Sequence, residues 1–181
     1  PGKPGLNFKF LLDYFASTDT TPSKPFDFNP GEIRLRNVSF AYIDKRYNDP
    51  ADGIDFEDIR LDKLQATLSN FIVQNDTLLA DLDHLSFTEK SGFRLEYMES
   101  NIRFTPNEVE FQNLLINTPN SNIQCEYKMS FENAEDFDDY INKVRMTSVF
   151  EEGTLSFLDL RYFAPELKGL EHEILIKGKV R

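Results

Sequence analysis

Cysteine, histidine and tryptophan are scarce in this chain of 181 residues, which has one Cys, two His and no Trp. A single Cys excludes a disulfide within the chain and any zinc site built from several thiolates. Two histidines far apart in the sequence, His84 and His172, are too few for a His-rich metal site. We therefore expect no metal and no cofactor.

Basic residues are outnumbered by acidic ones, 20 to 31, which gives a net charge of −11. This balance argues against nucleic acid as a partner, because nucleic-acid binding needs clustered cations. No stretch approaches the roughly 20 apolar residues of a membrane-spanning helix, and no signal peptide is visible. The chain opens on Pro1 without a Met and ends within an alternating pattern, so we expect it to be a piece of a longer polypeptide.

Motifs that carry catalysis are also missing. The sequence has no Gly-x-Gly-x-x-Gly, no Gly-Lys-Ser/Thr and no Gly-x-Ser-x-Gly. His84 falls in a strand pattern, and Cys125 occupies one apolar position of a regular alternation, which indicates a small buried hydrophobe. The acidic loop over residues 48–55 fails the spacing of an EF-hand. We predict no catalytic residue and no enzymatic activity.

What the chain does have is 17 Phe and a strong alternation of apolar and polar residues. The pattern over 123–131 is typical of an antiparallel strand with one apolar face, and 93–97 and 174–180 are similar. Apolar residues at helical spacing predict a short amphipathic helix over 137–144. Residues 1–30 are interpreted as a linker with a short helix over 6–15, and residues 31–181 as the β-rich segment.

One pattern recurs along the β-rich segment: apolar-x-apolar-x-(Asn/Asp)-apolar-x-apolar. At the polar position the alternation slips by one residue, which would turn every later side chain to the other face. A β-bulge there would absorb the slip, and Asn and Asp tolerate the backbone angles that a bulge can need. The rival geometry is a sharp corner at the same residue. The polar positions of the six copies are Asn37, Asp58, Asn70, His84 (a His variant), Asn113 and Asp159.

The copies start at unequal intervals, which favours a meander of neighbouring strands over a solenoid of fixed period. We therefore predict a mainly β fold, an extended curved antiparallel sheet with one short inserted amphipathic helix. The apolar side of such a sheet is either the core of a closed sandwich or an open concave face that holds an apolar ligand. The residues expected on this face are Leu35, Phe40, Phe71, Phe93, Leu95, Phe111, Cys125, Tyr127, Met129 and Phe157.

Five segments in this order resemble the N-terminal half of TamB-type translocation and assembly module proteins, of the wider AsmA-like group. They are GEIRLRNVSFAY (31–42), GIDFEDIRL (53–61), LSFTEKSGFRL (85–95), LLINTPNS (114–121) and DLRYFAPEL (159–167). The resemblance covers residues 26–181.

The resemblance implies a section of a periplasmic protein of Gram-negative bacteria that is anchored to the inner membrane by a helix outside this chain. It implies a taco-like β-groove with an apolar interior and no catalytic residues. It further implies phospholipid as a partner in lipid transport, and an Omp85-class outer-membrane barrel that binds regions outside this chain. The function expected from it is a non-enzymatic role in outer-membrane biogenesis.

Two other functions fit the same pattern. A closed β-sandwich would be a protein-interaction module that binds partners through its edges. A parallel β-helix would suggest a carbohydrate-active enzyme with a paired-carboxylate cleft, although the irregular spacing of the copies argues against it.

Overall fold

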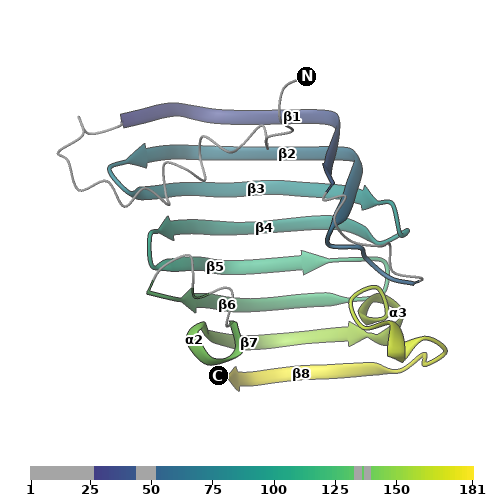
Figure 1. Cartoon of the computed structure of the whole chain (residues 1–181). Coiled ribbons are helices and arrows are strands. Elements are labelled where there is room, and N and C mark those ends of the chain that lie inside the picture. The colour runs from purple at the N-terminus through teal and green to yellow at the C-terminus, as the bar shows by residue number, and fades with distance from the viewer. Residues whose placement is uncertain (1–26, 44–51, 133–135, 137–139) are drawn as a thin grey trace.

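The computed structural model, described here for residues 27–43, 52–132, 136 and 140–181, contains one antiparallel sheet of eight strands. Each strand pairs with its neighbours in sequence, so the sheet is a meander with β1 and β8 at its two edges (Figure 1). The sheet is open. The strands are β1 (Asp27–Ile43), β2 (Asp58–Gln74), β3 (Thr77–Glu89), β4 (Arg94–Thr105), β5 (Glu108–Asn117), β6 (Asn122–Ser130), β7 (Arg145–Ser156) and β8 (Glu173–Val180).

The predicted mainly β, antiparallel fold is confirmed. The strand expected over 123–131 is β6 and the one over 174–180 is β8, with boundaries that differ by at most one residue, and the pattern at 93–97 falls at the start of β4, which continues eight residues further. β1 begins at Asp27, inside the segment that the sequence suggested as a linker. The helix predicted over 6–15 lies outside the described residues.

Three asparagines form the predicted bulges. Asn37, Asn70 and Asn113 have φ of 51°, 50° and 52°, in the left-handed region that Asn enters more readily than most residues. At each of them the strand pairing shifts by one residue. Because each bulge adds one residue to its strand, the apolar side chains before and after it point to the same face.

The other copies of the pattern differ from the prediction. The copy around His84 has a register shift between Leu82 and Leu85, and no positive φ at the histidine. Asp58 is the first residue of β2, so the first half of its copy lies before the strand. Lys63 has a φ of 54° in β2, where the sequence pattern gave no sign of a bulge.

The copy centred on Asp159 is not a strand. β7 ends at Ser156, whose side chain accepts a hydrogen bond from the Leu158 backbone N–H and so caps helix α3 (Phe157–Leu160). Serine at this position competes with strand formation because its hydroxyl satisfies a free N–H of the first helical turn. A short 3-10 helix, η2 (Pro165–Leu167), follows before β8.

Helix α2 (Tyr140–Lys143) lies between β6 and β7, within the segment predicted to be helical. It has four residues, and 137–139 are outside the described part of the chain. At the other end of the strands, β1 and β2 turn away from the plane of their neighbours (Figure 1). The left-handed residues Asn37 and Lys63 lie next to the Val38–Leu64 pair, where the register of β1 and β2 shifts.

The pairing also bears on the two other architectures considered. All strand pairs are antiparallel, so the described residues do not form a parallel β-helix. All eight strands belong to a single sheet, so these residues do not form the two stacked sheets of a sandwich.

Candidate ligand-binding face

One face of the sheet is apolar across all eight strands. Residues directly opposite each other on antiparallel strands point to the same face, so the register traces rows of side chains across the sheet. One row consists of Phe28, Val73, Leu78, Phe104, Val109, Met129 and Met146. Another consists of Leu35, Ala66, Leu85, Met98, Ile116 and Ile123. We refer to this side as the apolar face.

Most of the predicted residues share this face. Phe111 is opposite Tyr127, one strand over, and Val109 is opposite Met129. Beyond the Asn113 bulge, Leu114 is opposite Cys125. The pairing brings these predicted residues to the apolar face: Leu35, Phe40, Phe71, Leu95, Phe111, Cys125, Tyr127 and Met129.

The last two predicted residues lie outside the strands. Phe93 is in the turn before β4, where it is buried and its ring contacts Phe87, Tyr162 and Phe163 at centroid distances of 6.3, 5.8 and 5.1 Å. Phe157 opens α3 rather than lying on a strand, and its ring contacts His172. Its assignment to a strand was wrong because the Ser156 cap ends the strand one residue earlier.

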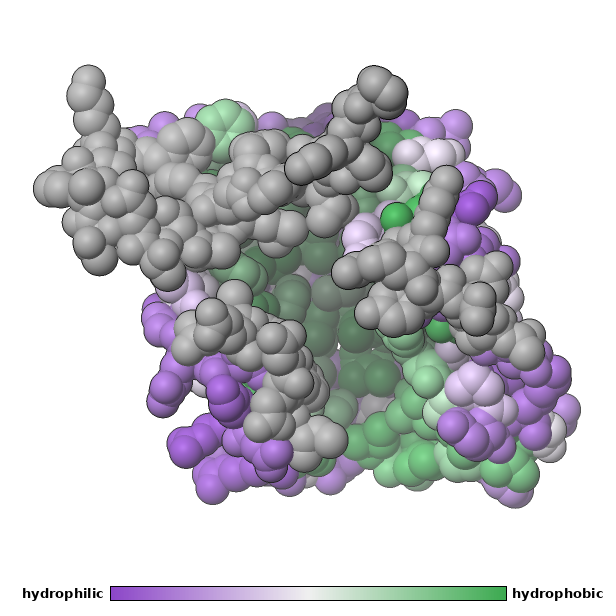
Figure 2. All heavy atoms as spheres, in the orientation of Figure 1, coloured by the Kyte–Doolittle hydropathy of each residue, from purple (hydrophilic) through white to green (hydrophobic). Residues whose placement is uncertain are grey.

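The apolar face is most buried at its centre and most exposed at the edges of the sheet. Leu95 on β4 and Leu114 on β5 are each 6% exposed, whereas Phe28 on β1 is 47% exposed and Val180 on β8 is 58% exposed. In the space-filling view, hydrophobic residues gather along the middle of the molecule between hydrophilic borders (Figure 2). Exposed apolar patches mark a binding site in many proteins, and the exposed residues of this face, such as Phe28, Met146 and Val180, lie on β1, β7 and β8.

Sequence reasoning missed several of the most buried members of this face. All five are apolar positions of the recurring pattern, but they were not among the residues singled out for the face. They are Val73, Ala80, Leu82, Val109 and Leu114.

Cys125 is an inert part of this surface at neutral pH. Burial raises the pKa of its thiol, and the neighbouring Glu126 carboxylate raises it further. A raised pKa keeps the thiol protonated, and the protonated form is a poor nucleophile. This agrees with the interpretation of Cys125 as a small buried hydrophobe.

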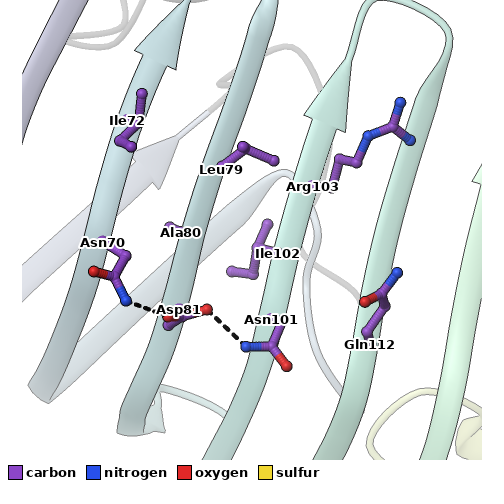
Figure 3. Close-up of a pocket in the computed structure, with 9 residues that line it drawn as sticks. All are labelled: Asn70, Ile72, Leu79, Ala80, Asp81, Asn101, Ile102, Arg103 and Gln112. Atoms are coloured by element: carbon purple, nitrogen blue, oxygen red, sulfur yellow. Dashed lines mark hydrogen bonds between the residues drawn. The ribbon is translucent and has the colours of Figure 1, made fainter.

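The opposite face carries a ladder of polar side chains that crosses from β2 to β5, and Figure 3 shows its bonds from Asn70 to Asn101. The Asn70 and Asn101 amides both donate to the Asp81 carboxylate, at 2.6 Å each, and Asn113 Nδ2 donates to Asn101 Oδ1 at 3.0 Å. The two bonds to the carboxylate lower the pKa of Asp81. Since Asn70 and Asn113 are bulge residues, the ladder links two bulges through their side chains.

The ladder borders a shallow depression of the same face. Ile72 and Leu79 lie along it together with the Arg103 side chain, which forms an ion pair with Glu108 at 2.5 Å (Figure 3). On the same face His84 Nε2 lies 3.0 Å from Ser86 Oγ, so the histidine has a hydrogen-bond partner within its own strand. The arrangement is that of a solvated surface held in register by side-chain hydrogen bonds.

Asp159 fixes α3 to one end of the strands. Its buried carboxylate accepts hydrogen bonds from Thr118 Oγ1 at 2.6 Å, Asn120 Nδ2 at 2.9 Å and Ser121 Oγ at 2.6 Å. These three donors belong to the β5–β6 turn. A carboxylate with three donors replaces much of its lost hydration, which explains how it can be buried.

The segment after α3 continues along the same end of the sheet. Tyr162 O accepts a hydrogen bond of 2.7 Å from Ile54 N, in the segment before β2. Gly53 has a φ of 87°, and a Cβ built on it would lie 2.8 Å from Tyr162 O, so no side chain fits there. The connection from β7 to β8 therefore touches the ends of strands that are far from it in the sheet.

Comparisons with protein-family models, with curated proteins and with solved structures found no match to this chain. Within the described residues, no group of three or more His, Cys, Asp or Glu side chains is placed to hold a metal ion. None of the helices in the described part is long and apolar enough to span a membrane.

Proposed function

We propose that this chain is a non-enzymatic segment of an envelope scaffold resembling TamB, which holds or conducts phospholipid acyl chains and supports outer-membrane protein assembly. The observation that carries the proposal is the apolar face, continuous from β1 to β8 and kept in phase by bulges at Asn37, Asn70 and Asn113. An ordinary core would be covered by a second sheet or layer of helices, and the described residues form only one sheet.

The chemistry of the face suits an acyl chain. Eight strands about 4.8 Å apart extend it over roughly 34 Å, long enough for an extended hydrocarbon chain to lie across several strands. Its side chains are aliphatic and aromatic groups such as Val109, Phe111 and Leu114, which offer area without directional bonds. Contacts of this kind let a chain bind by burial of apolar area and slide between equivalent positions.

The wider setting is part of the same proposal. We propose that the full-length protein lies in the periplasm and is anchored to the inner membrane. We further propose that it partners an Omp85-class outer-membrane barrel through regions outside this chain. The acidic surface, with a net charge of −11, would keep an open sheet soluble there.

A photocrosslinking experiment tests whether lipid lies on the apolar face. The pairs Phe111–Tyr127 and Glu110–Lys128 are adjacent on the same two strands but point to opposite faces. A photoreactive amino acid at position 111 or 127 should capture phospholipid in living cells, and the same amino acid at 110 or 128 should not. Equal capture from both faces would contradict the proposal.

Native mass spectrometry of the purified chain gives an independent measurement. We expect lipid adducts that disappear after organic extraction and return on addition of phosphatidylethanolamine. A Phe111→Glu variant places a charge on the apolar face and should lose the adduct, whereas Glu110→Gln on the polar face should keep it. A chain that never carries lipid would rule the function out.

A further inference from the structure

The connection between β7 and β8 is tied to the ends of strands across the sheet. We refer to its residues 157–170, which include α3 and η2, as the side segment (Figure 1). Lys168 Nζ forms an ion pair with Asp52 Oδ1 at 2.8 Å, and Tyr162 O accepts a hydrogen bond of 2.7 Å from Ile54 N. Since Asp52 and Ile54 lie before β2, the side segment reaches from β7 toward the opposite edge of the sheet, along one end of the strands.

Phe93 connects the side segment to the apolar face. Its ring is buried and contacts the ring of Phe163 at a centroid distance of 5.1 Å and the ring of Phe87 at 6.3 Å. Phe87 is opposite Leu95 on the neighbouring strand, so both point to the apolar face. A run of three aromatic rings therefore leads from the apolar face to the side segment.

Phe163 is the exposed end of this run, with 50% of the residue accessible to solvent. Its backbone is held in place, because Phe163 N and Ala164 N both donate to Leu160 O at 2.9 Å. A group that is already fixed loses little conformational freedom when a ligand covers it. The phenyl ring offers apolar area and has no hydrogen-bonding group, so it suits an apolar ligand.

We propose that the side segment forms a wall along one side of the lipid-binding face, and that the exposed part of the Phe163 ring contacts the bound acyl chain. This inference rests on the proposed function, because its ligand is the phospholipid acyl chain of that proposal. Burial of the ring against an acyl chain is favourable in itself and needs no directional bond.

The location of Phe163 favours this ligand over a further strand of a longer sheet. Phe93, which Phe163 contacts, lies in the turn before β4, and β4 is three strands away from β1 and four from β8. Strands added beyond either edge would lie about 14 Å or more from β4. The proposed contact is therefore independent of what pairs with the edges of the sheet.

Photocrosslinking of the purified chain, loaded with phosphatidylethanolamine, tests the contact. A photoreactive phenylalanine derivative at position 163 keeps an aromatic ring there and should capture the lipid. Leu79 is the matched control, because it is 43% exposed but lies opposite Arg103 on the polar face. The same derivative at position 79 should capture none. Equal capture at 79 and 163 would overturn the proposal.

The rate of lipid loss to lipid-free acceptor vesicles, followed by native mass spectrometry, measures what the contact contributes. Phe163→Ala should lose phosphatidylethanolamine about tenfold faster than the wild type, because about half of a phenylalanine side chain no longer covers the acyl chain. Leu79→Ala should lose it at the wild-type rate. Circular dichroism and thermal unfolding show that both variants remain folded. An unchanged rate in folded Phe163→Ala would overturn the proposal.

Position 111, on the apolar face itself, distinguishes this inference from the proposed function. Capture of phosphatidylethanolamine at 111 without capture at 163 would overturn the contact with the side segment and leave the proposed function standing. Absence of capture at both positions would overturn both.

Discussion

Asn37, Asn70 and Asn113 occupy backbone conformations that glycine fills in many β-bulges. Asparagine accepts positive φ at a lower cost than other residues with a Cβ, and it adds a side-chain amide that glycine lacks. At position 70 that amide donates to Asp81. Asn70 thus keeps the apolar side chains of β2 on one face and also hydrogen-bonds to the neighbouring strand β3.

This double role predicts the effect of substitutions at Asn70. Asn70→Val should lower the free energy of unfolding by about 1–3 kcal/mol, because a β-branched residue is strained at positive φ and the bond to Asp81 is lost. Asn70→Gly keeps the backbone conformation and should cost about 1 kcal/mol or less. Urea unfolding measures both, and equal losses would show that positive φ is not the cause.

Asp58, at the start of β2, gives a prediction on pH. Arg60 donates to its carboxylate at 2.8 Å and Lys90 Nζ lies 2.8 Å from it, and these interactions lower its pKa to about 2. A carboxyl whose pKa is lowered on folding stabilises the protein above its unfolded value, near 3.8, and this contribution is lost as the pH falls toward 2.

Lys90→Met removes one of the two cations. We expect the pKa of Asp58, followed by NMR of its side-chain carboxyl carbon, to rise toward 3.8 while Arg60 still holds it below that value. Lys128→Met, on the far side of the molecule near Glu108, serves as the control and should leave Asp58 unchanged. An unaltered pKa in Lys90→Met would assign the whole shift to Arg60.

At the scale of elements, α3 and the β5–β6 turn depend on Asp159. Asp159→Ala would leave the Thr118, Asn120 and Ser121 donors without their partner in a buried site. We expect a loss of about 2–4 kcal/mol in unfolding free energy, since several unsatisfied donors add their desolvation costs. Asp159→Asn keeps one acceptor oxygen and should lose less. Equal stability of the alanine variant and the wild type would contradict this role.

The same helix shows where sequence patterns reach their limit. The alternation predicted β6 and β8 because one face of each strand is apolar, and period two is a local property of the chain. It missed α3, because residues 155–162 also fit the strand pattern. The Ser156 cap ends the strand locally, and Asp159 holds the helix to a turn 38 to 41 residues away. The sequence also gave no indication of the positive φ at Lys63, since lysine is not a residue type that indicates a bulge.

For the candidate site, the sequence predicted the face but not its extent. Residues such as Phe111 and Tyr127 were identified because they are large and alternate with charges. Phe157 was assigned wrongly because one hydroxyl cap changed the local structure. Small members such as Ala80 fit the recurring pattern, and the register, which depends on pairing between strands, shows how far across the sheet their face extends.

At the scale of the whole molecule, Cys125 can report whether the apolar face is occupied, since it is the one thiol of the chain and lies within that face. Its raised pKa lowers the thiolate fraction at neutral pH, and burial limits access of reagents. We expect iodoacetamide to alkylate it at least about tenfold more slowly in the folded protein than in urea. Bound phosphatidylethanolamine should slow the reaction further, because an acyl chain on the face covers the sulfur.

Lys128→Cys in a Cys125→Ser background places the thiol on the polar face, where lipid should not change the rate. Equal slowing at both positions would mean that lipid coats the protein without preferring the apolar face, and no slowing at Cys125 would mean that the face does not bind it.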